Sequence, residues 1–314
     1  MRAVQFSEYG PPEVLQVAEV PEPHAGPGEI RIAVRASGLS AGEARLRSGE
    51  MRHVVPLTFP YRTGFDAAGV VDEVGDGVTG VRVGDEVFGM AHSAVRGANA
   101  DHVVLTAWAP KPAVWDWAEA GGAAGLVETA TRVFDRLAAG SGDTVLIQGA
   151  AGGVGTVAGQ LAAVRGARVI GTASARNHDF LRSLGVEPTT YGPGLVERVR
   201  ALAPAGVDAV FDCAGGALPD LVALAGDPAR VVTIADTTAA AHGVHMSHGV
   251  PDDGTALAAN ADRPAVHGLG LAVDLAAQGR LRIPVAAAFP LTHVAAAHEL
   301  SETRHARGKI ILMH

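Results

Sequence analysis

Alternating apolar and polar residues predict short strands in the first third of the chain. Residues 29–35 alternate apolar and polar side chains, which is typical of a strand with one buried face. Residues 69–75 predict a second short strand that ends in a Gly-Asp-Gly turn, and residues 81–89 predict a turn followed by a strand. Short strands separated by Gly and Asp turns indicate a barrel-like β domain.

The pattern changes near residue 118, where strands begin to alternate with helices. Short apolar runs predict strands at residues 144–148, 167–171, 208–212 and 230–234. Helices are predicted between them at residues 154–165 and 177–184. This alternation predicts a doubly wound parallel sheet that is covered on both faces.

The length of 314 residues exceeds what one hydrophobic core usually supports. After residue 280 the chain returns to strand and helix pieces and ends in an apolar run at 309–312. We expect this tail to rejoin the first domain. The predicted domains are therefore 1–117 together with 281–314, and 118–280.

Composition narrows the class of protein. Apolar residues make up 48% of the chain and charged residues 18%, which is typical of a globular protein. The net charge of −8 disfavours a nucleic-acid partner. Cys213 is the only cysteine, so no intrachain disulfide forms. The sequence has neither a membrane-length apolar run nor an apolar leader, and we expect a cytoplasmic protein that does not bind membranes.

A glycine-rich segment at 148–155 carries the strongest motif. Ala150, Gly152 and Gly155 have the spacing of a dinucleotide-binding fingerprint, with Gly153 and Val154 between the last two. The segment follows a predicted strand and opens a predicted helix, so a pyrophosphate is expected at the helix N-terminus. A glycine-rich turn without a ligand is the alternative, but the strand-turn-helix context favours the nucleotide site.

The end of the second predicted strand indicates which cofactor binds. NAD sites usually place Asp or Glu there to bind the ribose hydroxyls. Residues 171–177 contain no carboxylate, whereas Ser174 can donate a hydrogen bond and Arg176 offers a cationic fork for a 2′-phosphate. We therefore predict NADPH. The alternative is that Arg176 is a solvated residue at a helix start.

Several motifs together resemble the zinc-independent quinone oxidoreductase family of the medium-chain dehydrogenase/reductase superfamily. They cover nearly the whole chain and lie at residues 36–40, 64–71, 83–89, 128–130, 149–155 and 305–310. The resemblance implies a GroES-like β-rich catalytic domain built from both ends of the chain and a central Rossmann domain that binds the cofactor. It also implies an active site between the domains and a homodimer.

The resemblance also implies roles for individual residues. It places Thr129 beside the nicotinamide, Tyr191 beside the adenosine phosphate and Lys309 near the cofactor. The alternatives are a helix-start cap for Thr129, a half-buried packing aromatic for Tyr191 and an exposed tail charge for Lys309. Ser40 stands where many family members have an Asn that faces the nicotinamide, so this chain departs from the family pattern there.

Metal sites and protein nucleophiles are not expected. Zinc-dependent relatives need Cys and His where this chain has Ser40 and Phe65, and neither residue replaces those ligands. The triplet His242, His245 and His248 is expected in a loop or at a sheet edge, without a metal. Asp66 and Asp85 adjoin Gly or a turn, so turn or hydrogen-bonding roles are expected for them, and Cys213 is expected to be packed.

The sequence therefore predicts a zinc-free oxidoreductase that transfers a hydride from NADPH to a small molecule, either a quinone or a similar conjugated carbonyl compound. Two alternatives remain open. One is an enone or enoyl reductase that tailors a polyketide or another secondary-metabolite intermediate. The other is a protein that binds NADPH without turnover, as a sensor or a structural partner.

Overall fold

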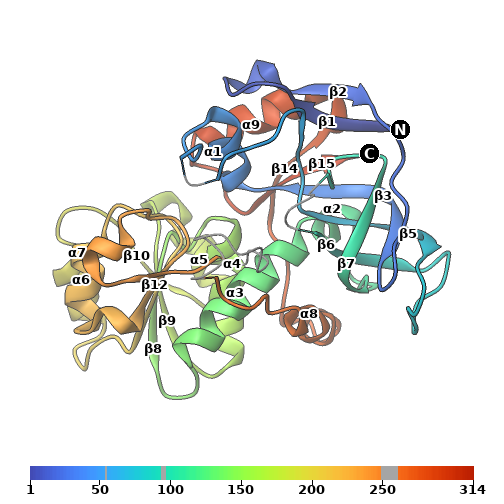
Figure 1. Ribbon diagram of the computed structural model, residues 1–314. Coiled ribbons are helices and arrows are strands. Elements are labelled where there is room, and N and C mark those ends of the chain that lie inside the picture. The colour runs from blue at the N-terminus through green and yellow to red at the C-terminus, as the bar shows by residue number, and fades with distance from the viewer. Residues whose placement is uncertain (54, 93–96, 249–260) are drawn as a thin grey trace. The chain divides into compact units, whose positions relative to one another are not determined.

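The computed structural model describes residues 1–53, 55–92, 97–248 and 261–314 and has mixed α/β structure (Figure 1). The chain forms two units, of which the first comprises residues 1–126 and 266–314 and the second residues 127–265. Helix α3 (Ala123–Leu137) carries the chain from the first unit into the second.

A closed sheet forms the centre of the first unit. Strand β3 (Ile30–Leu39) pairs with β5 (Asp66–Val74) and also with β7 (His102–Pro110). Strand β6 (Glu86–Ala91) joins β5 to β7, so the four strands close into a barrel. Strand β15 (Lys309–Met313) pairs with β3, and the C-terminal tail thereby rejoins the first unit, as the sequence predicted.

Smaller elements complete the first unit. A three-stranded sheet has the order β2-β1-β4, and β14 lies at the edge beside β15. The remaining strands and the helices are β1 (Arg2–Phe6), β2 (Gln16–Glu19), β4 (Tyr61–Arg62), β14 (Val285–Pro290), α1 (Ala41–Ser48), α2 (Trp117–Gly121), α8 (His267–Ala277) and α9 (Val294–Glu302).

The unit boundaries differ from the expected ones at α2 and α8, which were assigned to the cofactor domain from the sequence. Helix α2 contacts β3 and β5, and a Cβ atom at Gly121 would lie 2.6 Å from the Cβ atom of Ala36. Helix α8 contacts β7. A helical sequence pattern shows that a helix forms, but it does not show which sheet the helix covers.

The second unit contains a six-stranded parallel sheet with the order β10-β9-β8-β11-β12-β13. This is the doubly wound order of dinucleotide-binding folds, which confirms the predicted fold class. The strands are β8 (Thr144–Gln148), β9 (Arg168–Thr172), β10 (Glu187–Thr189), β11 (Ala209–Asp212), β12 (Val231–Thr233) and β13 (His245–Met246).

Helices connect these parallel strands and cover the sheet. They are α4 (Gly153–Val164), α5 (His178–Arg182), α6 (Leu195–Leu202) and α7 (Leu218–Ala225). Leu146, Ile170, Val210 and Val231, from four adjacent strands, share one buried core. The strands read as continuous apolar runs because both faces of such a sheet are buried.

The close approach of α4 to β8 depends on glycine. Gly149 has a left-handed backbone with φ 78°. A Cβ atom at Gly155 would lie 2.4 Å from the carbonyl oxygen of Gly149 and 2.7 Å from the Cα atom of Ala150. Gly171 in β9 is similarly confined, because its Cβ atom would lie 2.6 Å from that of Ala150. Larger residues at 155 or 171 would push the helix away from the sheet.

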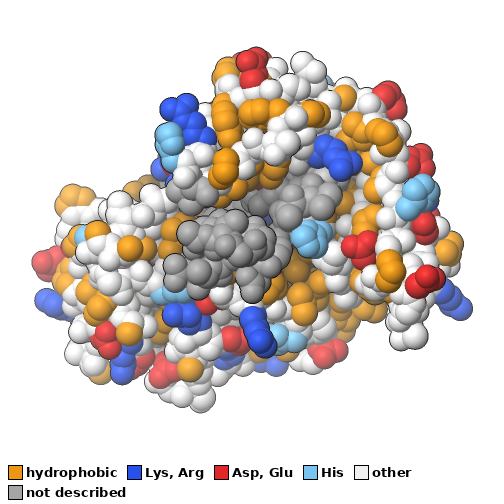
Figure 2. Space-filling view, viewed as in Figure 1, with side chains coloured by type: hydrophobic (Ala, Val, Ile, Leu, Met, Phe, Trp, Pro, Cys, Tyr) orange, Lys and Arg blue, Asp and Glu red, His pale blue; other side chains and the backbone are white. Residues whose placement is uncertain are grey.

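No helix among the described residues is long and apolar enough to cross a membrane. On the face drawn in Figure 2, side chains of both charge signs are interspersed and do not form a continuous basic surface. This mixed surface is consistent with the net charge of −8.

A buried histidine lies between the helices of the first unit. His298 in α9 is fully buried, and neither ring nitrogen has a hydrogen-bond partner among the described residues. Arg47 in α1 is also fully buried and is paired with Glu302 and the carbonyl oxygen of Gly10. Burial, together with the nearby Arg47 charge, lowers the pKa of His298 to about 3.

This burial makes stability depend on pH. The unfolded chain binds a proton at His298 below pH ~6.5, whereas the folded protein does not until about pH 3, so acidification within this window favours unfolding. The free energy of unfolding should fall when the pH is lowered from 7 to 5. In His298→Leu this fall should be smaller than in the unmodified protein by about 1–2 kcal/mol. Urea unfolding at both pH values measures this, with exposed His293→Leu as the control. An unchanged pH response in His298→Leu would contradict the assignment.

The glycine contacts predict different outcomes for two similar substitutions. Gly155→Ala should destabilise the protein by about 1–3 kcal/mol, because its methyl group overlaps the backbone of the preceding turn. Gly152→Ala should fold with little change, because its Cβ atom has ordinary contact, at 3.5 Å, with the Gly149 oxygen. Thermal unfolding of both variants measures the difference. Equal melting temperatures would show that the turn adapts and does not require glycine at 155.

Candidate functional site

The carboxyl ends of parallel strands meet at one edge of the sheet, and the predicted site residues of the second unit follow these ends. The fingerprint follows β8, residues 174–176 follow β9, and Tyr191 follows β10. Strands β9 and β10 are neighbours whose register pairs Thr172 with Thr189. Ligands of doubly wound folds bind at this carboxyl edge, where the strand order reverses.

The first turn of α4 offers backbone groups to an anion. Gly152 is the N-cap residue, and no side chain caps the helix there. Gly152, Gly153 and Val154 are partly exposed, whereas Ala150 and Gly155 are buried. The free N–H groups of a helix N-terminus and the helix dipole together favour a phosphate. These three residues are therefore the accessible part of the fingerprint.

Hydrogen bonds to Thr172 of β9 fix the glycine-rich turn. The Gly149 N–H donates to the Thr172 hydroxyl at 2.9 Å, and the Ala150 N–H donates to the Thr172 carbonyl at 2.9 Å. The Thr172 hydroxyl donates in turn to the Gln148 side chain at 2.6 Å. At Gly152, the Gly149 oxygen is the only atom of the described residues near an added Cβ, so these residues leave the space above it open. A cradle that glycine leaves open fits the close approach of a pyrophosphate.

A second loop at this edge was not predicted from the sequence. Asp212 ends β11 and is fully buried. Its carboxylate accepts the N–H groups of Ala214 and Gly215 and the hydroxyl of Thr233. A Cβ atom at Gly149 would lie 2.9 Å from that of Ala214, so this loop lies against the fingerprint. The sequence signal was an Asp at the end of an apolar strand, with a Gly-Gly pair three residues later at 215–216.

Cys213 in this loop is half-buried. Burial and the neighbouring Asp212 carboxylate raise the pKa of its thiol well above the usual value. A thiol that stays protonated is a weak nucleophile, which agrees with the packing role expected for it.

The residues predicted to bind the adenosine phosphate lie at the ends of β9 and β10. Ser174 is half-buried, and Arg176 is exposed. Within the described part of the chain, no hydrogen bond or ion pair engages the Arg176 guanidinium. Tyr191 is 53% exposed, so it is not a packed aromatic. Arg198 donates to the carbonyl oxygens of Thr190 and Tyr191, which fixes the loop that carries Tyr191.

Thr129 lies within α3 and is not at its start, which excludes the helix-cap alternative. The residue is half-buried, and its hydroxyl donates to Glu128 at 3.3 Å. Arg132 donates to the same hydroxyl at 3.4 Å and to Glu128 through its Nε atom at 2.7 Å. Glu128 and Arg132 are 4% and 6% exposed. They form a buried ion pair that the sequence analysis did not identify.

The pair belongs to a larger polar network at the carboxyl end of β13. The Arg132 guanidinium donates to Ser247, whose hydroxyl donates to Asp262 at 2.5 Å. Asp262 also contacts His245 at 3.0 Å and Arg136 at 2.9 Å. Burial acts to raise the pKa of Asp262, but the bonds from Ser247 and His245 outweigh it and the pKa is lowered.

The histidine triplet lies at a sheet edge, as expected. His245 is in the edge strand β13, His242 ends the 3-10 helix before it, and His248 follows the strand. Over the residues that the structure describes, no group of three or more His, Cys, Asp or Glu side chains is placed to bind a metal ion.

In the first unit, Ser40 is the N-cap residue of α1. Its backbone N–H donates to the Glu43 carboxylate at 2.9 Å. Glu43 is buried and also accepts the N–H of Gly64, so it joins the start of α1 to the segment before β5. Ser40 itself is half-buried at the end of β3.

Asp66 and Lys309 form a second buried ion pair. The Lys309 Nζ atom lies 3.3 Å and 3.4 Å from the two carboxylate oxygens of Asp66. Burial raises the pKa of Asp66, while the Lys309 charge opposes this rise. Lys309 is only 4% exposed, so it is not a free tail charge, and Asp66 begins β5 and is not a turn residue. Glycine at 38 and 122 leaves room for the lysine side chain.

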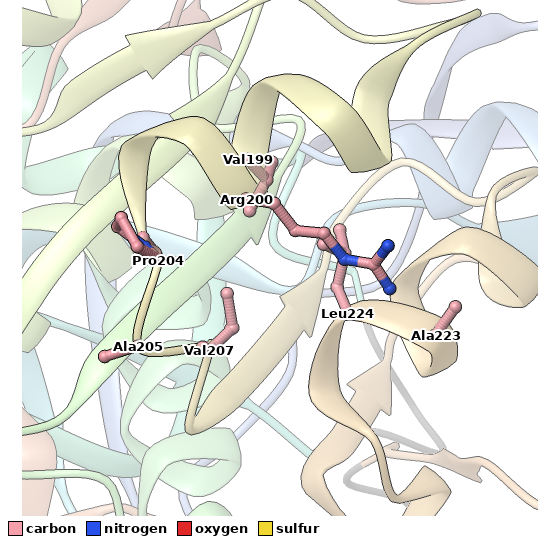
Figure 3. Close-up of a pocket in the computed structure, with 9 residues that line it drawn as sticks. Val199, Arg200, Pro204, Ala205, Val207, Ala223 and Leu224 are labelled. Atoms are coloured by element: carbon pink, nitrogen blue, oxygen red, sulfur yellow. The ribbon is translucent and has the colours of Figure 1, made fainter.

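A separate hollow lies between α6 and α7 (Figure 3). Val199, Arg200, Val207 and Leu224 are among its lining residues. Val207 precedes β11, so the hollow opens at the amino edge of the sheet, opposite the fingerprint. Because ligands of this fold bind at the carboxyl edge, this hollow is not the candidate site.

Two family models match the chain. The alcohol dehydrogenase GroES-like domain matches residues 26–137, and the zinc-binding dehydrogenase domain matches residues 184–312. The first covers all four barrel strands, and the second covers part of the parallel sheet and the C-terminal tail.

Curated proteins with similar sequences include oxidoreductases and a polyketide synthase protein. Quinone oxidoreductase of Rattus norvegicus is 37% identical over 180 residues, which is 56% of this chain and 53% of the relative. The spectinabilin polyketide synthase system protein NorB of Streptomyces orinoci is 36% identical over 212 residues, 66% of this chain and 9% of the relative. The aligned part thus spans about half the length of the curated quinone oxidoreductase and a small part of the synthase.

Among solved structures, an alcohol dehydrogenase superfamily protein from Novosphingobium aromaticivorans has a TM-score of 0.84 and 30% identity. The match covers 100% of this chain and 99% of that protein. The fold, the two family models and this structural relative all indicate a dehydrogenase with a GroES-like domain and a dinucleotide-binding domain, as the sequence motifs did. The chain therefore belongs to the alcohol dehydrogenase superfamily.

Proposed function

We propose that this protein is an NADPH-dependent oxidoreductase that reduces a quinone or a similar conjugated carbonyl compound without zinc. The observation that carries the proposal is the uncapped N-terminus of α4, which follows β8 at the switch point of the sheet and above whose Gly152 the described residues leave an open space. Such a helix start matches the chemistry of a dinucleotide pyrophosphate.

Each part of the cofactor has proposed partners in the chain. Gly152, Gly153 and Val154 would bind the pyrophosphate through backbone N–H groups. Thr129 would lie beside the nicotinamide, and Lys309 remains a predicted cofactor-side residue whose ammonium group is already paired with Asp66. The bound cofactor would supply a hydride, which with one proton from solvent converts a quinone into a hydroquinone.

The preference for NADPH over NADH rests on two observations at the end of β9. No carboxylate lies in residues 173–177 to bind ribose hydroxyls. Arg176 is exposed and unengaged among the described residues, and Ser174 lies two residues before it. A guanidinium fork and a hydroxyl together match a 2′-phosphate. Tyr191, exposed at the end of the neighbouring strand, would pack beside the adenosine phosphate.

The acceptor class follows from the protein groups at hand. Ser40 and Phe65 stand where a zinc-dependent enzyme needs ligands, so no Lewis acid is expected to polarise an isolated carbonyl. A quinone or an enone spreads the incoming charge over a conjugated system, and a hydroxyl group such as that of Ser40 then suffices to position it. We propose a homodimer in the cytoplasm, on the strength of the family resemblance.

The similarity to a polyketide synthase protein favours a second candidate, an enoyl or enone reductase that acts on a biosynthetic intermediate. Such an enzyme would share the same cofactor site. A panel of quinones, enals and enones with NADPH consumption as the readout separates the two. Tight NADPH binding with no turnover across the panel would favour a sensor or a structural protein instead.

Arg176→Ala should remove most of the preference for NADPH. A charge-assisted phosphate contact contributes about 1.5–3 kcal/mol, so the affinity for NADPH should fall about 10- to 150-fold while NADH binding changes little. Titration calorimetry with both cofactors measures this. Arg182→Ala is the control, because Arg182 is an exposed arginine of the following helix that pairs with Asp179. Equal affinity of the unmodified protein for both cofactors would refute the preference.

No single hydroxyl should be an obligatory proton donor. Thr129→Val and Ser40→Ala should each lower kcat with a quinone by less than about 100-fold, because positioning is their main contribution. Ser40→Ala should leave NADPH affinity close to unchanged, and Thr129→Val should lower it by no more than about 10-fold. Steady-state kinetics and calorimetry check this, and turnover should survive treatment with a chelator. A loss beyond about 10⁴-fold from either variant would indicate general acid catalysis and would favour the enoyl reductase.

A further inference from the structure

The Thr129 hydroxyl has little hydrogen-bonding freedom. A hydroxyl has one hydrogen to donate and two lone pairs that accept. The Thr129 hydroxyl donates its hydrogen to Glu128 at 3.3 Å, and one of its lone pairs accepts from the Arg132 Nη2 atom at 3.4 Å. Among the residues that the structure describes, the second lone pair has no partner. The side chain is half-buried, so this lone pair remains available to a ligand.

Glu128 cannot exchange roles with the hydroxyl. As a carboxylate it only accepts hydrogen bonds, and its Oε1 atom already accepts the Arg132 Nε at 2.7 Å and the Ala265 N–H at 3.1 Å. Its Oε2 atom accepts Arg132 Nη2 at 3.3 Å as well as the Thr129 hydroxyl. Reversing the Thr129 hydroxyl would leave a buried carboxylate oxygen with one donor fewer and would set the hydroxyl hydrogen against the guanidinium.

Hydrogen bonds also fix the position of the Arg132 guanidinium. Its Nη1 atom donates to Ser247, and the Ser247 hydroxyl donates to Asp262. Ser247 follows the edge strand β13, so these contacts tie α3 to the carboxyl edge of the parallel sheet, where the fingerprint also lies. A buried ion pair of this kind adds little net stability. Its effect is instead to give the neighbouring hydroxyl a fixed direction.

We propose that the Glu128–Arg132 pair fixes Thr129 as a hydrogen-bond acceptor toward the nicotinamide carboxamide, whose NH2 group is a donor. This inference rests on the proposed function, because it needs a nicotinamide beside Thr129. It makes Glu128 and Arg132 positioning residues. It also gives a reason for the cofactor's amide to be preferred over a ring substituent that has only an acceptor.

The test compares NADP⁺ with its 3-acetylpyridine analogue, in which a methyl ketone replaces the carboxamide and the NH2 donor is lost. Titration calorimetry gives the ratio of the two affinities. The unmodified protein and Thr129→Ser should bind NADP⁺ about 3- to 10-fold more tightly than the analogue, as expected for one neutral hydrogen bond. In Thr129→Val the ratio should fall to within about twofold of unity, because the acceptor is gone.

The ion pair is tested by replacing both partners, since removing one alone leaves a buried unpaired charge. In the double variant Glu128→Leu with Arg132→Met, the hydroxyl is free to donate to the carbonyl of either cofactor. The ratio should again approach unity. Arg136→Ala is the control, because Arg136 pairs with Asp262 and does not touch Thr129, and it should keep the full ratio.

The outcomes are distinguishable. A full ratio in Thr129→Val, or in a folded double variant, would overturn the inference, as would equal binding of both cofactors by the unmodified protein. If the double variant does not fold, the comparison of Thr129→Val with Thr129→Ser decides the matter alone. Failure of the unmodified protein to bind either cofactor would refute the proposed function and not this inference.

Discussion

The contact between the first turn of α4 and the end of β8 is the constraint on which the candidate site depends. With a Cβ atom only 2.4 Å from the Gly149 oxygen, no residue larger than glycine fits at 155 without displacing the helix. The same contact brings the uncapped helix N-terminus to the carboxyl edge of the sheet. Asp212 and Thr172 then shape the surroundings of the turn by accepting its backbone N–H groups and those of the neighbouring loop.

Each unit also holds one buried ion pair beside a predicted site residue. Lys309 is paired with Asp66 in the barrel, and Arg132 is paired with Glu128 beside Thr129. Desolvation offsets most of the attraction in such pairs, so they are poor sources of stability. Their value lies in geometry, because a charge whose partners are fixed in turn fixes the groups that it contacts. This view assigns both pairs to positioning and not to proton transfer.

Much of the fold could be predicted because its signals are local. The apolar run of β8 and the start of α4, one residue before the predicted one, follow from short sequence patterns. The placement of α2 and α8 could not be predicted, because a helix pattern does not identify its partner sheet. Glu128 and Arg132 have the four-residue spacing of a helical ion pair, but their burial depends on Ser247 and Asp262, which are distant in sequence. The sequence also left open that Lys309 is an exposed charge of the tail. Its burial depends on the pairing with Asp66, which is distant in sequence.

The most direct test of the account is amide hydrogen exchange of the whole protein with and without NADPH. If the cofactor lies at the carboxyl edge of the parallel sheet, NADPH should slow exchange at residues 149–156, at 173–177 after β9 and at 213–216 after β11. The hollow between α6 and α7, at residues 199–207, should show no such change. Slowed exchange at that hollow, with none at 149–156, would contradict the central claim that the glycine-rich turn is the cofactor site.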